Sequence, residues 1–176
     1  MDLRPDVRIP FPRALVFAAY RDHIADLLPF LPNVRSVTVT SRVQEGAVTK
    51  LVNVWGGGGD VPAAIRAALG DSLSWTDYAT WDESALRCEW RTETAAFGEA
   101  LKCSGANEYL EDGPDKTLIE IRGTLQVDAT RLRGVPRLFA GKVGRAIEEF
   151  LGGKIGANLV ETAKGVARYL EQQAKA

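Results

Sequence analysis

The chain has 176 residues, of which 45% are hydrophobic and 26% are charged, and its formal net charge at neutral pH is −1. These values are typical of a globular protein, so we expect residues 1–176 to form a single domain with a sizeable core. A net charge near zero excludes a surface built as a whole to hold nucleic acid. No apolar run approaches the roughly 20 residues of a membrane-spanning helix.

The first residues lack the basic and then apolar layout of a signal peptide, so we expect a cytoplasmic protein. Two cysteines, Cys88 and Cys103, are too few for a disulfide framework or a cysteine-based zinc cluster. His, Asp and Glu do not recur at metal-ligand spacing either. We therefore expect no metal and no cofactor.

The N-terminal segment predicts one strand and two short helices. Residues 7–11 alternate apolar and polar side chains, as a half-buried strand does. Residues 13–22 predict a first helix and residues 23–28 a second one. Pro29 and Pro32 are expected to end the second helix, because proline cannot continue a helix and restricts the residue before it.

From residue 34 the hydrophobic period changes to two, which predicts six strands joined by short turns. Their approximate ranges are 34–44, 48–55, 73–81, 86–92, 101–110 and 119–127. Glycines 56–59, followed by Asp60, predict a mobile connection. A nucleotide-binding loop is disfavoured because no Gly-Lys-Ser/Thr follows. Residues 62–69 predict a short inserted helix.

The last forty residues predict one long helix, from about residue 136 to residue 173, roughly 55 Å in length. Its apolar positions recur every three or four residues: Phe139, Val143, Ile147, Leu151, Ile155, Leu159, Ala163, Val166 and Leu170. Several glycines lie inside it, including the pair Gly152-Gly153. They indicate a kink, close packing on a neighbour, or a space left for a ligand.

Consecutive strands with short turns form an antiparallel meander, and its apolar face needs a cover. The terminal helix is the element long enough to supply that cover. We therefore expect an α+β fold, in which a curved antiparallel sheet of about seven strands wraps around the long C-terminal helix. Two short helices would follow the first strand. A sheet wrapped around one helix leaves an interior that side chains need not fill.

This order of elements resembles the helix-grip fold of the START/Bet v 1-like superfamily, also called SRPBCC. Residues 9–17 (IPFPRALVF) and 28–37 (LPFLPNVRSV) carry the resemblance best, since a strand, a short helix, a PxFLP-like corner and a second strand open many members. Those members include the polyketide cyclase/dehydrase and ubiquinone-binding branches. Residues 72–124 resemble the PRELI-type lipid-transfer branch. The resemblance implies a cavity for apolar ligands such as lipids, sterols, polyketides or quinones, and a minority of members are enzymes.

The sequence contains few candidates for catalytic or redox residues. His23, beside Asp22 and Asp26, is expected to be a solvated surface residue, because a general base needs a pocket and an orienting partner. If the hairpin turn is centred on residues 95–96, Cys88 and Cys103 are opposed on adjacent strands. We expect two buried reduced thiols there, and a cross-strand disulfide is the alternative.

The large aromatic residues of the sheet are Trp55, Trp75, Trp81, Trp90 and Tyr109. Core packing is their simplest role, although buried Trp and Tyr usually need a partner for N–H or O–H and would otherwise orient a ligand. The helix start carries a basic run: Arg131, Arg133, Arg137, Lys142 and Arg145. Solvated charges are the simplest interpretation of this run. Transient contact with an anionic membrane or lipid head group is the alternative.

The first functional hypothesis is binding or transport of a hydrophobic small molecule between the sheet and the terminal helix, with no nucleic-acid partner. The candidate ligand-binding residues are Phe17, Tyr20, Leu28, Phe30, Val54, Trp75, Trp90, Asn107, Tyr109, Phe139, Val143, Ile147 and Phe150. A cyclase, aromatase or dehydratase on the same scaffold is the alternative, and it would need an inward acid–base pair. A ligand-free interaction module with a filled interior is the third hypothesis.

Overall fold

The computed structural model describes residues 1–57, 74–95, 97–132 and 136–175. The strands are β1 (Asp2–Leu3), β2 (Asp6–Ile9), β3 (Val34–Glu45), β4 (Val48–Gly57), β5 (Ser74–Asp82), β6 (Arg87–Glu93), β7 (Leu101–Glu111) and β8 (Thr117–Val127). The α-helices are α1 (Arg13–Asp22) and α3 (Ala140–Gln173). Four short 3-10 helices join them: η1 (Leu28–Phe30), η2 (Gly98–Ala100), η3 (Ala129–Arg131) and η4 (Arg137–Phe139).

The described part of the chain forms one antiparallel sheet of eight strands in the order β1-β8-β7-β6-β5-β4-β3, with β2 also paired to β8. The meander β3 to β8 follows chain order, as the alternating sequence predicts. The N-terminal segment returns to the far edge and pairs with β8 in two pieces, which explains one strand more than expected.

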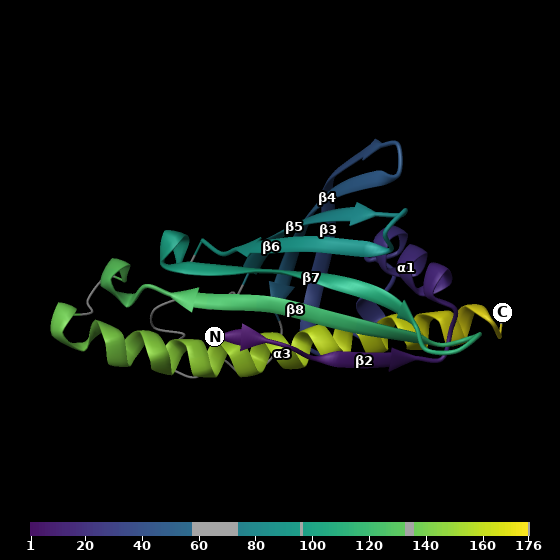
Figure 1. Ribbon diagram of the computed structural model, residues 1–176. Helices are drawn as coiled ribbons and strands as arrows, with labels where there is room; N and C mark the ends of the chain where they lie inside the picture. Colours follow the sequence, from purple (N-terminus) through teal and green to yellow (C-terminus); the bar gives the residue numbers. More distant parts are fainter. Residues whose placement is uncertain (58–73, 96, 133–135, 176) are drawn as a thin grey trace.

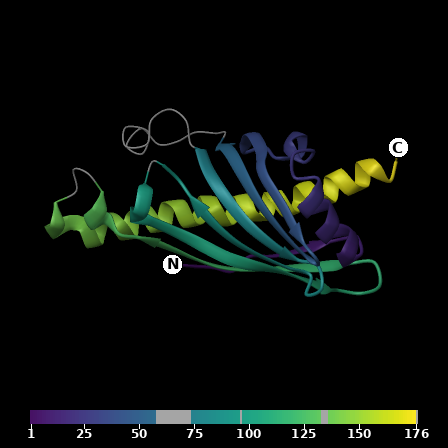
Figure 2. The same ribbon diagram turned by 90° about the horizontal axis from the view of Figure 1, so that it is seen from above.

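Helix α3, about 50 Å long, runs across the concave side of the sheet (Figure 1). Figure 2, seen from above, shows that α3 runs along the whole sheet and that the twisted strands cross it at an angle. Its buried face includes Leu151, Ala163, Val166 and Leu170. The predicted arrangement of a curved sheet around a long terminal helix is therefore confirmed.

Helix α3 is continuous through the glycine pair that suggested a break. A Cβ added at Gly152 would collide with the Met1 side chain, so close packing explains that glycine. Gly153 faces open space. The helix begins at Ala140 rather than at residue 136, because the residues after Pro136 form the 3-10 turn η4 first.

The predicted second helix over residues 23–28 is wrong. Only α1 is an α-helix in the described part of this region. It ends at Asp22, and a turn then leads into η1. Pro29 lies in the first turn of η1, where its missing N–H is tolerated, and the chain then becomes extended at Leu31. In the glycine run, Gly56 and Gly57 belong to β4, whereas the predicted helix over residues 62–69 lies outside the described residues.

The predicted register of the hairpin β6–β7 is also wrong. Cys88 pairs with Asn107, and Cys103 pairs with Thr92, so the two cysteines are offset by four positions along the ladder. The hairpin is centred between Phe97 and Gly98 rather than on residues 95–96, in a connection that contains η2 and a left-handed Gly98 with φ of 51°. Both thiols are buried and free, as expected of reduced cysteines, and the disulfide alternative fails.

Within the described residues, no helix is long and apolar enough to cross a membrane.

Candidate ligand-binding cavity

A cavity of about 530 Å³ lies between the inner face of strands β4 to β7 and the middle of helix α3. The sheet contributes every second residue of each strand, because side chains alternate between the two faces. Helix α3 contributes Phe150, Leu151, Ile155, Leu159 and Thr162 from the opposite wall. The wall as a whole is predominantly apolar, with a few polar side chains.

The sheet side of the cavity is built in rows, because the antiparallel register brings inward residues of neighbouring strands opposite one another. One row is aromatic and pairs Trp55 with Trp75. The next row is polar: Asn53, Asp77, Thr92 and Cys103. A third row consists of Leu51, Ala79, Trp90, Gly105 and Gly123. A polar stripe therefore crosses the sheet between two apolar rows.

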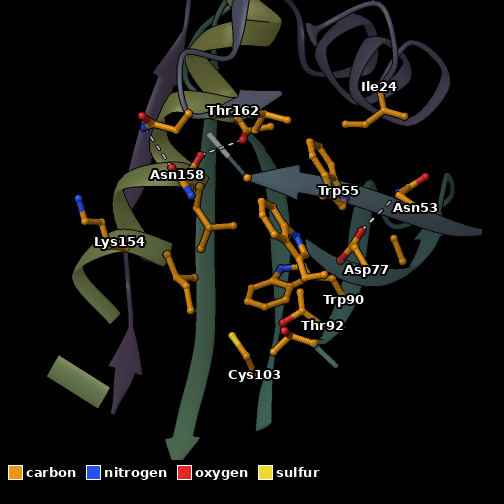
Figure 3. Close-up of a pocket in the computed structure, with 18 of the residues that line it drawn as sticks. Ile24, Asn53, Trp55, Asp77, Trp90, Thr92, Cys103, Lys154, Asn158 and Thr162 are labelled. Carbon is orange, nitrogen blue, oxygen red and sulfur yellow. Dashed lines mark hydrogen bonds between the residues drawn. The ribbon is translucent and has the colours of Figure 1, made fainter. Parts of the chain in front are cut away.

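Asp77 is the acidic residue on the cavity wall. The Asn53 amide donates a hydrogen bond to the Asp77 carboxylate, Nδ2 to Oδ2, at 3.4 Å. Burial raises the pKa of Asp77 to about 6, and the Asn53 hydrogen bond offsets part of that rise. Figure 3 shows this pair on the sheet side of the cavity, opposite Asn158 and Lys154 of α3.

Trp90 is held flat against the sheet by two glycines. A Cβ at Gly105 would lie 2.6 Å from Trp90 Cζ2, and a Cβ at Gly123 would lie 3.0 Å from Trp90 Cη2. These two glycines face each other in register on β7 and β8. The indole Nε1 donates a hydrogen bond to Asn107 Oδ1 at 2.8 Å, in a buried position. Missing side chains on two strands thus leave room for one large aromatic ring and fix its orientation.

The α1 end of the cavity is closed by aromatic packing. The Phe17 ring meets the rings of Trp81 and Tyr109 edge-on, each at a centroid distance of 5.2 Å. Tyr20 also meets Trp81 edge-on, at 5.4 Å, and lies on the cavity wall. Burial raises the pKa of Tyr20, and the nearby charge of Asp77 raises it further, so this phenol stays protonated at neutral pH.

Buried polar atoms without a hydrogen-bond partner in the described structure are concentrated around the cavity. They are Asn53 Oδ1, Trp55 Nε1, Trp81 Nε1 and Thr94 Oγ1 on lining residues, and the Tyr109 hydroxyl behind them. An unpaired buried polar group costs about 1–3 kcal/mol, so such groups are rare where nothing binds. Their concentration indicates a cavity that a ligand or ordered water completes.

Solved structures match this architecture along its whole length. The Zhui aromatase/cyclase from Streptomyces sp. R1128 aligns with a TM-score of 0.72, at 17% identity, over 100% of this chain and 96% of that chain. The chain has the helix-grip fold. A START superfamily protein from Mycobacterium smegmatis aligns at 0.57 (14% identity, 98% of each chain), and norcoclaurine synthase from Thalictrum flavum at 0.58 (12% identity, 97% of this chain and 86% of that one).

No protein-family model matches the sequence, and no curated protein is detectably similar to it in sequence. The helix-grip proteins that match in structure include an aromatase/cyclase, a synthase and a START superfamily protein. At such low identities the likeness establishes the fold, and the chemistry must be argued from the cavity itself.

Five of the predicted site residues lie on the cavity wall of this helix-grip structure: Tyr20, Trp75, Trp90, Asn107 and Phe150. Four others belong to the packed core or its edge rather than to the wall: Phe17, Leu28, Phe30 and Tyr109. Ile147 and Val143 are half-buried on α3 beyond the cavity, and Phe139, 53% exposed, lies in η4.

Val54 was placed on the wrong face of the sheet. It is 38% exposed on the outer face, whereas its neighbours Asn53 and Trp55 point inward, because adjacent residues of a strand alternate. The same alternation, taken from Trp75 and Ala79, places Asp77 on the inner face. The alternation in the sequence is therefore the signal that identifies Asn53, Trp55 and Asp77 as inward-facing.

His23 is a surface residue, as predicted. Its Nδ1 lies 2.9 Å from Asp26 Oδ2, and its ring stacks on Tyr169 with a centroid distance of 5.4 Å. It does not line the cavity. Within the described residues, no group of three or more His, Cys, Asp or Glu side chains is placed to hold a metal ion.

The basic residues at the start of α3 differ in whether an acidic partner lies beside them. Arg131 donates hydrogen bonds to Glu99 and Asp128 and is therefore occupied. Arg133 lies outside the described residues. Three exposed cations of the run have no ion pair in the described structure: Arg137, Lys142 and Arg145.

Proposed function

We propose that this helix-grip chain binds a hydrophobic small molecule in the cavity between its sheet and helix α3. The cavity itself carries the proposal, since about 530 Å³ with a mainly apolar and aromatic wall has the size and composition of a small-molecule site. The ligand would be a flat or aromatic molecule rather than a flexible chain, because the indoles of Trp55, Trp75 and Trp90 present large rigid surfaces.

An enzyme of the cyclase, aromatase or dehydratase kind is the second candidate. Asp77 favours it, because a carboxyl with a pKa of about 6 can donate or accept a proton near neutral pH. General acid–base catalysis also requires a partner that completes the proton transfer. Tyr20, Cys88 and Cys103, the titratable groups near Asp77, all have raised pKa values and stay protonated. Binding is therefore the function that we place first, and the ligand-free interaction module is disfavoured by the cavity.

Native mass spectrometry of the protein purified from its own host, followed by organic extraction, tests the proposal. We expect a co-purifying apolar molecule in near one-to-one amount. Ile155→Trp, on the cavity wall, should reduce that amount at least about tenfold by filling the site. Ile147→Trp is the matched control, since Ile147 is half-buried on the same helix but does not line the cavity.

An empty protein that also fails to bind fatty acids, sterols, quinones and aromatic polyketides would contradict the binding function. Equal ligand content in the two tryptophan variants would show that the ligand binds elsewhere. The first result would favour the ligand-free interaction module.

We also propose transient contact between the start of α3 and an anionic membrane surface. Leu138 is 87% exposed and Phe139 is 53% exposed, and both lie beside the three unpaired cations of the basic run. Apolar side chains flanked by cations are suited to the boundary between anionic head groups and acyl chains. A cytoplasmic location, which reduced Cys88 and Cys103 would suit, remains part of the proposal.

A further inference from the structure

We propose that the cavity selects ligands that carry a protonated amine, held by the Asp77 carboxylate and by the indole faces beside it. This inference rests on the proposed binding function and specifies the chemical class of the ligand. It is carried by the position of Asp77, the one acidic side chain that lines the cavity among the described residues, next to an aromatic row.

The Asp77 carboxylate has no cationic partner in the described structure. Asn53 is its hydrogen-bond partner, and Tyr20, Cys88 and Cys103 are the titratable groups that feel its charge, from α1, β6 and β7. All three stay neutral near pH 7, so none of them balances a negative charge. Asp77 is half-buried on the wall of a mainly apolar cavity, where a charge without a partner is costly, and a ligand cation would compensate it.

Two cations do lie on the cavity wall, Arg35 on β3 and Lys154 on α3. Both are exposed, and Figure 3 shows Lys154 on the opposite wall from Asp77. Neither contributes to the pKa of Asp77, which is set by burial and by Asn53. Lys154 would repel a ligand cation from the α3 side of the cavity, so we expect the ammonium on the sheet side, at Asp77.

The aromatic row next to Asp77 strengthens this assignment. Trp55 and Trp75 are parallel within 3° at a centroid distance of 6.0 Å, and Trp75 lies two residues before Asp77 on the same face. That spacing is about 7 Å along a strand. An ammonium bound to the carboxylate therefore lies within reach of indole faces, which attract cations through the ring quadrupole.

A matched set of probes tests the inference: 1-naphthylmethylamine, 1-naphthalenemethanol and 1-naphthoic acid, which share one aromatic skeleton and differ in charge. Isothermal titration calorimetry at pH 7.5 would compare the intact protein with Asp77→Asn and with Asp115→Asn. Asp115 is exposed in the β7–β8 turn, so its variant removes the same charge away from the cavity.

We expect the intact protein to bind the amine roughly tenfold or more tightly than the alcohol, as one partly desolvated charge pair provides, and the acid most weakly. Asp77→Asn should abolish the preference, and Asp115→Asn should retain it. Amine affinity should also fall as the pH is lowered from 7.5 to 5, because Asp77 becomes protonated, and Asp77→Asn should show no such fall.

Two results would overturn the inference while leaving the binding function intact: the amine binding no more tightly than the alcohol, or an unchanged amine preference in Asp77→Asn. If none of the three probes binds and extraction also yields nothing, the binding function and the inference fail together.

Discussion

Replacing Asp77 with asparagine should stabilise the protein, although Asp77 lies at the centre of the candidate site. Burial raises the pKa of this carboxyl from 3.8 to about 6, so the folded state favours the protonated form. As the pH rises from about 4 to about 6, the unfolded state loses its proton first and the folded state loses stability. Each pKa unit corresponds to about 1.4 kcal/mol, so the full cost above pH 7 is about 3 kcal/mol.

The amide in Asp77→Asn has nearly the same shape and carries no charge. Urea unfolding should therefore give a free energy of unfolding higher than that of the intact protein by up to about 3 kcal/mol at pH 8, and by about half of that at pH 5. Tryptophan fluorescence and circular dichroism can follow both transitions. Asp115→Asn, in an exposed turn, should differ from the intact protein by less than about 0.5 kcal/mol at either pH.

A difference between Asp77→Asn and the intact protein that stays constant from pH 5 to pH 8 would refute this reasoning, since only the titration of Asp77 makes it grow. A destabilised Asp77→Asn at pH 8 would show that the carboxylate has a stabilising partner. In that case its charge would not be available to a ligand.

Further substitutions test the packing and the membrane proposal. Gly105→Ala should destabilise the protein by about 2 kcal/mol and shift the fluorescence of Trp90, because a Cβ there would overlap the indole; an unchanged spectrum would contradict that packing. Gly153→Ala, where a Cβ meets nothing within 4 Å, should instead raise stability by up to about 1 kcal/mol, and a loss of stability would be evidence against an open helix surface there. Asn107→Leu should cost about 1–3 kcal/mol in urea unfolding because it leaves the buried Trp90 N–H unpaired, whereas a cost near zero would mean that water replaces the amide. Phe139→Ser should weaken sedimentation with vesicles that contain anionic lipid, with neutral vesicles as the control, and equal sedimentation would argue against docking through this end of α3.

The architecture could be predicted from the sequence because it follows from local periodicity. Alternation from residue 34 onward specified the meander, and a three-to-four spacing of apolar residues specified a helix too long for anything except a sheet to cover. The ends of helices and strands are harder to predict from the sequence, because only a few residues determine each of them. The segment after α1 was too short to distinguish a helix from a turn followed by η1.

Strand alternation in the sequence also determines which residues face inward. Val54 obeys the alternation by pointing outward between Asn53 and Trp55. Asp77 obeys it by facing the cavity together with Trp75 and Ala79. The same alternation predicts that the polar row of Asn53, Asp77 and Thr92 faces inward.

Only the tertiary structure decided which inward residues line a cavity and which fill the core. Phe17 and Tyr109 are as apolar and as inward as Trp90, yet they pack against Trp81 at the closed end, whereas Trp90 lies on the open wall. The register between β6 and β7, which are joined through η2 and Gly98, brought Cys103 into line with Thr92 and Gly105 into line with Trp90. Whether an inward side chain packs against another side chain or lines a cavity depends on residues that are distant in the sequence. A local pattern of apolar and polar residues does not specify those contacts.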